Sequence, residues 1–324
     1  MSDFLSELLQ QIVNGLSLGA IYALIAVGYT MVYGVLRLIN FAHGDVFMIG
    51  AVVAWYTGKL LVRTGHAPAD SAMMQVMLVL ALLLVPVLIC SVLGFTIERF
   101  AYRPLRNRPR LASLITAIGV SMLLEYGMQT EVAAGGAKYS LFGPTPQGMP
   151  SILPWMENAL QIGNVFIVPI DPIIMGLTIA LMVGLSLIIK YTRMGMAIRA
   201  VSHRVDTAAL MGINVNKVIS QTFILGSALA AVGGVLWAIK YTKVEPLMGL
   251  MPGIKAFVAA VLGGIGNIYG AVLGGLLLGL VEVLVEGFVV GGSQYRDGVA
   301  FVILIAVLLI KPSGLLGGST HEKV

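Results

Sequence analysis

Charged residues are scarce in this sequence. Asp, Glu, Lys and Arg make up only 11% of the 324 residues, against about 25% in a typical soluble domain. Hydrophobic residues make up 58%, and the mean hydropathy is +0.95. A soluble globule could not bury so much apolar surface, so the composition indicates an integral membrane protein.

Cysteine and an early basic segment are also missing. Cys90 is the single cysteine and lies in an apolar run, which excludes a disulfide framework and favours a packing role. No Lys or Arg precedes Arg37, whereas a cleaved signal peptide begins with basic residues. The first apolar run is therefore expected to remain as a membrane anchor. Because no low-complexity linker interrupts the chain, we predict a single transmembrane domain over residues 1–324.

Motifs for nucleotide binding, metal binding and catalysis are absent from the sequence. No G-x-x-x-x-G-K-[ST] occurs, and the glycine-rich stretches Gly263–Gly270 and Gly314–Thr320 lack the lysine of a phosphate-binding loop. The four histidines are far apart and have no cysteine or acidic partners at metal-ligand spacing. Ser202, His203 and Asp206 are close together but lack a nucleophile-elbow pattern. The sequence thus predicts no enzyme, no metal site and no catalytic residue.

Long apolar runs divide the chain into membrane spans, because a helix needs about 20 apolar residues to cross a hydrocarbon core of about 30 Å. The runs are Leu8–Tyr29, Phe47–Leu61, Met74–Ile97, Leu111–Gln129, Pro172–Ile189, Val218–Ile239, Ala271–Val290 and the shorter Val299–Ile310. Basic residues are concentrated in two loops, 99–110 and 190–217, which the positive-inside rule places in the cytoplasm. The segment between them, 131–171, has one lysine and several prolines and is predicted to form an external hairpin.

The second half of the chain needs one further crossing. If both the loop before Val218 and the tail with Lys311 are cytoplasmic, the chain between them must cross the membrane an even number of times. The spans at 218–239, 271–290 and 299–310 give an odd number of crossings. The segment Lys255–Gly270 is apolar from Ala256 to Leu262 and then broken by glycines, as in a discontinuous helix. We therefore predict an all-α integral membrane protein with about eight transmembrane helices and a broken or re-entrant element near residues 255–270.

The second basic loop contains a short helical pattern. Ala208 to Met211 form a helical segment that stops at Gly212, a residue type favoured just past a helix end. Such a helix between basic residues can dock in a groove of a soluble partner. The same charges would equally favour a helix lying on anionic lipid headgroups.

Polar residues and glycines within the spans supply candidates for a translocation path. Ionisable residues inside a membrane are costly, so Glu125 and the pair Glu282 and Glu286, which share a helix face, are candidates for function or for paired packing. His43 and Asp45 are expected near the cytoplasmic edge, where a hydrogen bond within a loop is favoured over contact with the substrate. Asn40 is expected to cap the following turn. Helix ends exposed at a glycine break could solvate the charged groups of an amino acid. The candidate path residues are Asn40, His43, Asp45, Glu125, Gly263, Gly264, Gly266 and Glu282.

Four stretches carry a family resemblance. Asn14–Gly50 contains an INFAHGD segment after the first span, Leu114–Gly119 reads LITAIG, and Lys255–Gly275 reads KAFVAAVLGGIGNIYGAVLGG. Together with Arg193–Val218 they resemble the permease subunits of branched-chain amino acid ABC transporters, in order and over most of the chain. The segment 131–171 matches least.

The resemblance implies the role of the cytoplasmic loop, about 191–217. Family members are similar to other ABC importers in having a coupling helix that contacts the ATPase, and the matching residues here are Arg199, Ala208, Ala209, Gly212 and Ile213. Where other importers carry a Glu before the alanines, this chain has Asp206 and Thr207, which leaves the polar contact with the ATPase open.

The resemblance also implies partners and location. We expect an ATP-driven importer for branched-chain amino acids in the bacterial cytoplasmic (inner) membrane, of which this chain forms half of the path. Its partners would be a second permease subunit, two cytoplasmic ABC ATPases that bind ATP and Mg, an extracytoplasmic amino-acid-binding protein and the lipid bilayer. No cofactor in this chain and no nucleic acid are expected. Two alternatives remain: a permease of the same type for urea, short amides or other amino acids, and an ion-coupled secondary transporter in which Glu125, Glu282 or Glu286 carries protons.

Overall fold

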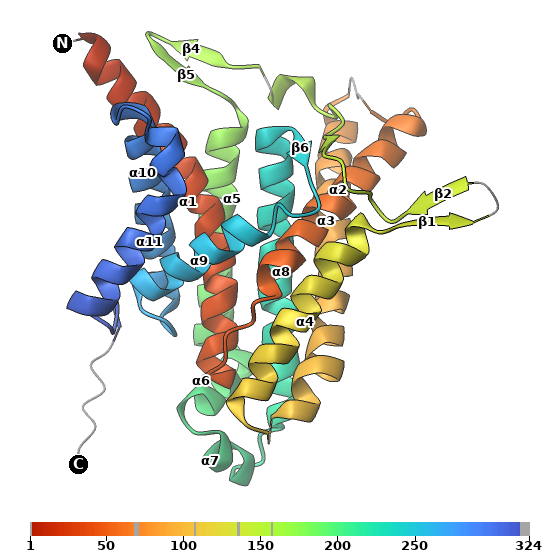
Figure 1. The fold of residues 1–324 in the computed structure, drawn as a ribbon, viewed down its shortest axis with the longest axis vertical. Coiled ribbons are helices and arrows are strands. Elements are labelled where there is room, and N and C mark those ends of the chain that lie inside the picture. Colours follow the sequence, from red (N-terminus) through yellow and green to blue (C-terminus); the bar gives the residue numbers. More distant parts are fainter. Residues whose placement is uncertain (1, 68–70, 107, 135–136, 157, 318–324) are drawn as a thin grey trace.

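The computed structural model describes residues 2–67, 71–106, 108–134, 137–156 and 158–317, and almost all of its regular structure is helical (Figure 1). The α-helices are α1 (Ser2–Leu36), α2 (His43–Arg63), α3 (Ala72–Ile97), α4 (Arg110–Gln129), α5 (Ile170–Tyr191), α6 (Arg193–His203), α7 (Val205–Leu210), α8 (Val215–Tyr241), α9 (Leu250–Gly263), α10 (Ile268–Phe288) and α11 (Gly292–Ile310). Within the described residues, eight of them are long and apolar enough to cross a membrane. The predicted fold class is confirmed.

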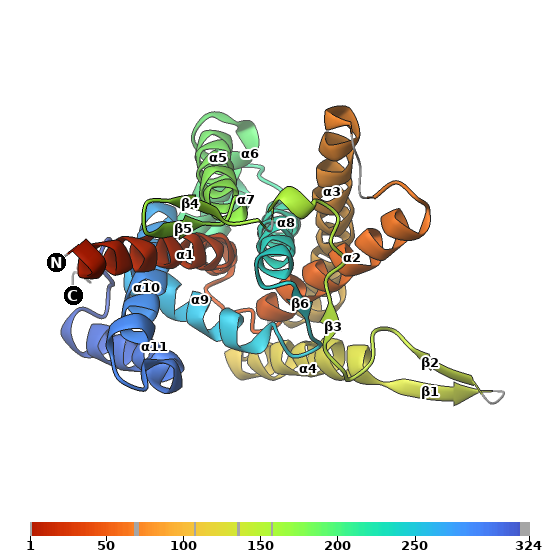
Figure 2. The ribbon, with the colours of Figure 1, turned by 90° about the horizontal axis from the view of Figure 1, so that it is seen from above.

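A buried first helix forms the centre of the bundle. In Figure 2, α8 lies at the centre and α1 runs from one edge of the molecule toward it, and the side chains of α1 from Ser17 to Val32 are buried. In contrast, α3, α4, α5 and α11 expose apolar side chains along most of their length. Such an inside-out distribution suits peripheral helices that face lipid or another membrane subunit.

Glycines permit the most extensive contact between two helices among the described residues, that of α1 with α10. A Cβ atom on Gly15 would lie 2.9 Å from the Cα atom of Leu280, and one on Gly19 would lie 2.7 Å from the Cα atom of Leu276. Both distances are too short for any side chain, so only glycine allows the two backbones to approach this closely. Gly15 and Gly19 are four residues apart, so both lie on the side of α1 that packs against α10.

The predicted break after α8 is a discontinuous span. After α8 ends, strand β6 (Lys243–Val244) pairs with β3 (Gln147–Gly148), which lies in the segment 131–171. The 14-residue helix α9 then runs toward the opposite end of the molecule, where its last carbonyls accept hydrogen bonds from residues that follow α11. At 1.5 Å per residue α9 is about 21 Å long, too short to cross alone. An extended segment and a short helix together replace one full span.

The segment 131–171 forms short antiparallel strand pairs. Strands β1 (Glu131–Ala134) and β2 (Ala137–Ser140) pair, as do β4 (Leu160–Ile162) and β5 (Val165–Ile167), with a 3₁₀ turn at Pro154–Met156 before β4. The Gln10 side chain of α1 makes hydrogen bonds of 2.9 Å and 2.7 Å with both backbone groups of Phe166. The β4–β5 pair and α7 lie at opposite ends of the molecule (Figure 1).

Candidate functional site

The helices α6 and α7 form a tip at one end of the molecule, between α5 and α8. Thr192 caps α6 through a 3.1 Å bond from the backbone N–H of Gly195. Helix α7 ends at Gly212, whose φ of +82° requires the left-handed region that glycine adopts at low cost. The N–H groups of Gly212 and Ile213 donate to the carbonyls of Ala209 and Ala208 at 3.0 Å and 3.1 Å. This is a Schellman termination, so the predicted helix stop is present.

The predicted coupling residues do not all face outward. Ala208 is buried and packs inward, so it can support the loop but does not form part of its exposed surface. Ala209, Gly212 and Arg199 are exposed, and Ile213 is half-buried. The alternation arises because α7 packs one side of its short helix against α6 and α8.

Two residues that the sequence prediction omitted dominate the surface of this tip. Leu210 is 88% exposed and Met211 is 79% exposed. Isolated exposed leucines are ordinary, but two adjacent apolar side chains at the end of a protruding helix form a contact patch. The sequence could not show that these two side chains point outward, because a helix of six residues has no repeating pattern of apolar residues.

Asn40 and His43 make contacts inside the bundle. The Asn40 side chain is not a helix cap: its Oδ1 atom accepts a 2.9 Å hydrogen bond from the Tyr102 hydroxyl, and α2 begins without a side-chain cap. The His43 ring is buried against Gly28 of α1, and its centroid lies 4.6 Å from that of the Tyr29 ring. Gly28 is about two turns from the end of α1, so α2 starts inside the bundle. The expected cap role of Asn40 is therefore wrong, and the position of His43 relative to the cytoplasmic edge stays a prediction.

Asp45 and Glu125 come together between α2 and α4. Asp45 accepts a 2.5 Å hydrogen bond from the Ser121 hydroxyl, and its side chain also contacts that of Glu125. This is a contact between helices and not the loop hydrogen bond that was expected for Asp45. One Glu125 oxygen is buried without a partner among the described residues.

Glu282 of α10 contacts three other helices through two ion pairs and one hydrogen bond. Its Oε1 atom lies 2.6 Å from the Lys255 ammonium of α9, accepts a bond from Arg296 of α11, and lies 3.3 Å from the Tyr22 hydroxyl of α1. Glu286, one turn further along α10, lies 3.2 Å from Arg296. Both glutamates therefore act as paired packing groups, one of the two roles the sequence left open. Lys255 and Arg296 were not predicted as partners, because they lie on different helices.

The glycine break lies at a helix end that the chain itself covers. The carbonyls of Leu262 and Gly263 accept 2.8 Å and 3.0 Å hydrogen bonds from the N–H groups of Leu315 and Leu316. Gly264, at φ +106°, packs against the backbone of Gly317, and Gly266 is exposed. These two carbonyls are therefore already paired within the chain. The use of Gly263, Gly264 and Gly266 in a translocation path stays a prediction.

Two further charged pairs escaped the sequence prediction. At the α7 end, α3 is followed by a π-helical turn (Glu98–Tyr102) and a 3₁₀ turn (Arg103–Leu105). Glu98 pairs with Arg106 and accepts a 2.5 Å hydrogen bond from the Ser220 hydroxyl. Burial lowers the pKa of the Arg106 guanidinium, and the Glu98 carboxylate opposes that shift. At the other end, Asp171 pairs with Lys240. Each of these residues lies at the boundary of an apolar run, which is the only signal the sequence carries.

The arrangement defines a class of protein. Eight apolar spans, a discontinuous ninth element, buried ion pairs between helices and an apolar tip at one end describe a multi-pass membrane transport protein with a docking surface.

Comparison with known proteins gives the family. The chain belongs to the branched-chain amino acid transport system / permease component family, whose model matches residues 11–308. It is 43% identical over 336 residues to the high-affinity branched-chain amino acid transport system permease protein LivH of Escherichia coli (strain K12), over 100% of both chains. It is 44% identical over 318 residues to the permease protein BraD of Pseudomonas aeruginosa, over 98% of both chains. No solved structure matches the chain.

Proposed function

We propose that this chain is one membrane-spanning permease subunit of an ATP-driven importer of branched-chain amino acids. Family membership over residues 11–308 and the names of full-length relatives at 43–44% identity support the substrate and the transport role. The feature of the structure that supports the mechanism is the exposed apolar tip of α7, next to Gly212. It offers a surface on which a separate ATPase can act.

The assembly we propose has a second permease subunit, two cytoplasmic ABC ATPases and an extracytoplasmic amino-acid-binding protein, in the bacterial cytoplasmic membrane. ATP and Mg bind the ATPases, and this chain holds no cofactor. With α7 in the cytoplasm, the N-terminus and the strand pairs β4–β5 lie outside, where the binding protein docks. Docking of α7 in a groove of the ATPase is favoured over an interfacial helix because α7 protrudes beyond the ends of α5 and α8.

The tip is connected to the core in a way that can transmit motion. Helix α6 follows α5 after Thr192, and α8 begins at Asn214, which caps it through a 3.0 Å bond from the Lys217 N–H. Helix α8 in turn packs against α1, α2 and α3. Displacement of the tip by ATP-driven closure of the ATPases therefore moves α5 and α8 relative to the rest of the bundle.

The test is retention of the ATPase by the purified permease. Leu210→Asp with Met211→Asp puts two charges at the centre of the docking surface, and we expect the ATPase subunits to be lost while the two permeases remain together. Leu111→Asp is the matched control, because Leu111 is an exposed leucine in the first turn of α4, directly after the other basic loop. If the tip variant retains the ATPases and ATP-driven leucine uptake as the control does, α7 is not the coupling element.

A further inference from the structure

A charged cluster joins the end of α3 to the start of α8, beside the α7 tip. It consists of Glu98, Arg106, Asn216 and Ser220, and we call it the α3–α8 cluster. Glu98 directly follows α3 and is fully buried. Both of its carboxylate oxygens are used, Oε1 by Arg106 and Oε2 by the Ser220 hydroxyl at 2.5 Å. Asn216 lies in the first turn of α8, close to the end of α7 at Leu210.

The Arg106 guanidinium bridges the two sides of this cluster. One terminal nitrogen pairs with Glu98, and the other donates a 2.5 Å hydrogen bond to the Asn216 side chain. Arginine carries a planar fork of donors, which fixes the relative position of two acceptors more strictly than the single ammonium of a lysine does. Apolar contacts alone would let two helices slide along each other, whereas these directed bonds hold α3 and α8 in one register.

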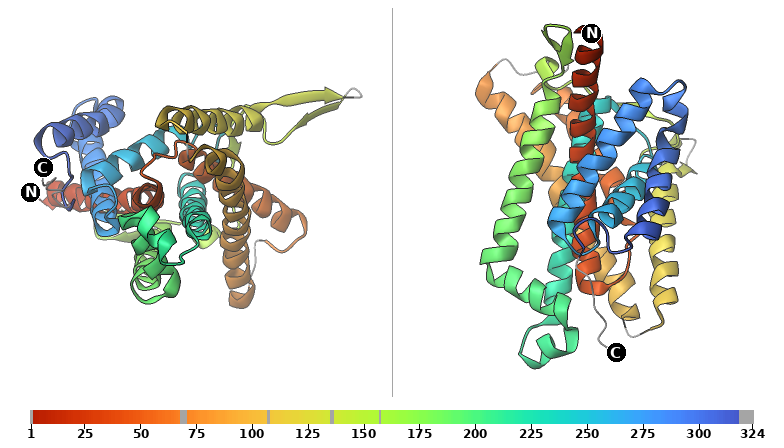
Figure 3. Two further views of the ribbon diagram at one scale, coloured as in Figure 1. Left: turned by 90° about the horizontal axis from the view of Figure 1, so that it is seen from below. Right: turned by 90° about the vertical axis from the view of Figure 1, so that its left-hand side faces the viewer.

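The two helices are also closely packed further inside the bundle. A Cβ atom on Gly94, one turn before Glu98, would lie 2.0 Å from the Ser227 Oγ atom and 3.1 Å from the Phe223 carbonyl oxygen. Only glycine at this position allows such a close approach. The ring centroids of Tyr102 and Phe223 are 5.3 Å apart. Seen from below in Figure 3, α3 lies beside α8, so the cluster closes the end of a helix pair that is already tightly packed.

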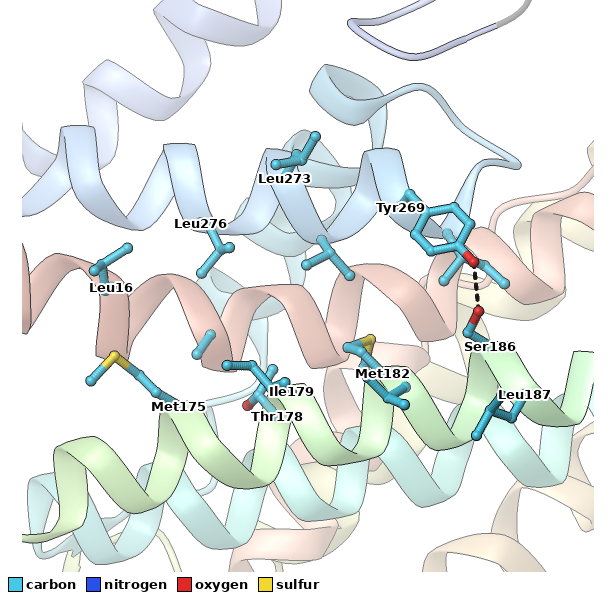
Figure 4. Close-up of a pocket in the computed structure, with 14 residues that line it drawn as sticks. Leu16, Met175, Thr178, Ile179, Met182, Ser186, Leu187, Tyr269, Leu273 and Leu276 are labelled. Carbon is cyan, nitrogen blue, oxygen red and sulfur yellow. Dashed lines mark hydrogen bonds between the residues drawn. The ribbon is translucent and has the colours of Figure 1, made fainter.

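The other helix that leaves the tip is packed less closely. Helix α5 runs along one edge of the molecule (Figure 3, right). An apolar groove of about 760 Å³ separates α5 from α10, with α1 as its floor (Figure 4). The hydroxyls of Ser186 and Tyr269 join the two walls at 2.6 Å. A displacement of the tip therefore meets a tightly joined pair on the α8 side and a loosely packed helix on the α5 side.

We propose that Glu98 and Arg106 are positioning residues, which join α3 to α8 so that a displacement of the α7 tip moves both helices as one unit. This rests on the proposed function, in which the ATPases act on the tip, and it adds α3 to the parts that move. Without the cluster, α8 would slide along α3, and part of the displacement would be lost before it reached the centre of the bundle. The expected defect is in coupling: the ATPases stay bound and hydrolyse ATP, but less leucine is carried for each ATP.

Loss of the bridge between Arg106 and Asn216 tests the coupling. Arg106→Lys keeps the charge beside Glu98 but cannot reach Asn216 at the same time, and Asn216→Ala removes the same bond from an exposed position of α8. In the complete importer, we expect each variant to lower the leucine transported per ATP hydrolysed by about tenfold, which corresponds to the loss of one hydrogen bond to a charged group. Arg108→Lys, at an exposed position of the same loop, is the matched control and should keep the wild-type ratio.

Distances between spin labels measure the movement directly. Phe100→Cys with Lys217→Cys places labels at exposed positions after α3 and in the first turn of α8, and Lys217→Cys with Ile310→Cys relates α8 to the last turn of α11. Cys90 is fully buried and should not take up label. Between the nucleotide-free and the ATP-bound importer, we expect the second distance to change and the first to stay the same. In the Arg106→Lys background, both distances should change.

The outcomes separate this proposal from the proposed function. Failure of the unmodified importer to accumulate leucine with ATP would overturn the proposed function, and the label distances would still decide whether α3 and α8 move together. A wild-type ratio in both Arg106→Lys and Asn216→Ala overturns the role of the cluster. Loss of the ATPases from Arg106→Lys overturns it as well, because Arg106 would then belong to the docking surface.

The label distances decide the case even where a variant of the cluster does not fold. With Glu98 and Arg106 intact, a change between positions 100 and 217 as large as that between 217 and 310 would show that the two helices move separately. An unchanged distance between positions 217 and 310 would show that α8 does not move with ATP. Either result overturns the proposal.

Discussion

Neutralising Glu282 should weaken the bundle far more than neutralising Glu286, although both carboxylates contact Arg296. In Glu282→Gln, the Lys255 ammonium loses its buried partner and keeps only Asp297, at 2.6 Å. Glu282 is 1% exposed and Lys255 is 5% exposed, so neither group has water to replace the lost contact. The structure therefore predicts a large loss of stability when one carboxylate oxygen is replaced by an amide nitrogen.

The expected magnitudes differ because the environments differ. Removing one partner of a buried ion pair costs about 3–5 kcal/mol, and we expect about 3 kcal/mol for Glu282→Gln, since Asp297 still compensates part of the charge. Glu286 is 40% exposed and lies 3.2 Å from Arg296. An exposed pair of this kind contributes about 0–1 kcal/mol, so Glu286→Gln should be nearly neutral.

The measurement is the thermal stability of the detergent-purified importer, which is determined as the fraction of protein that stays monodisperse after heating. Glu282→Gln should lower the midpoint by several degrees, and Glu286→Gln is the control on the same helix. Lys255→Met combined with Glu282→Gln should lose less than the sum of the two single variants, because residues in contact are coupled. Equal losses for the two glutamates, or strict additivity for the pair, would refute this reasoning.

Two further predictions concern glycines. Gly19→Ala should lower the melting midpoint, because its new Cβ would lie 2.7 Å from the Leu276 Cα atom. Gly34→Ala is the control: its Cβ meets no atom within 4 Å, so the change should be neutral or stabilising by up to about 1 kcal/mol. A larger loss of stability in Gly34→Ala than in Gly19→Ala would contradict the packing of α1 on α10. Gly212→Ala should destabilise the local turn by roughly 1–2 kcal/mol, because residue 212 has a φ of +82°. Because α7 is short and peripheral, hydrogen exchange of its amides should become about tenfold faster while the melting midpoint of the bundle stays the same. Unchanged exchange would show that the Schellman turn does not hold α7.

The order and approximate positions of the long helices could be predicted from the sequence, because crossing a membrane sets a minimum apolar length. The discontinuous element near residues 255–270 could also be predicted, since parity and the glycines indicated it together. Gly212 was identifiable because only the left-handed region ends a helix in this way. These features depend on local chemistry or on simple counting.

Depth and pairing could not be predicted in the same way. Hydropathy indicates that α2 is long and apolar enough to cross a membrane, but it does not indicate that α2 begins inside the bundle, with His43 buried against Gly28. The partners Lys255, Glu282 and Arg296 lie on three helices, and their contacts depend on how those helices pack. The same limitation hid the side that Ala208 faces, because a six-residue helix has no repeating pattern to show its buried side.

The cover over the end of α9 has a consequence for how the protein is made. The last carbonyls of α9 find their partners only in Leu315 and Leu316, which leave the ribosome after α10 and α11. Until then these carbonyls have no backbone donor in lipid, where unpaired polar groups are costly. The discontinuous span therefore completes these hydrogen bonds only after α10 and α11 have been synthesised, and a chain that ends after α10 would lack both donors.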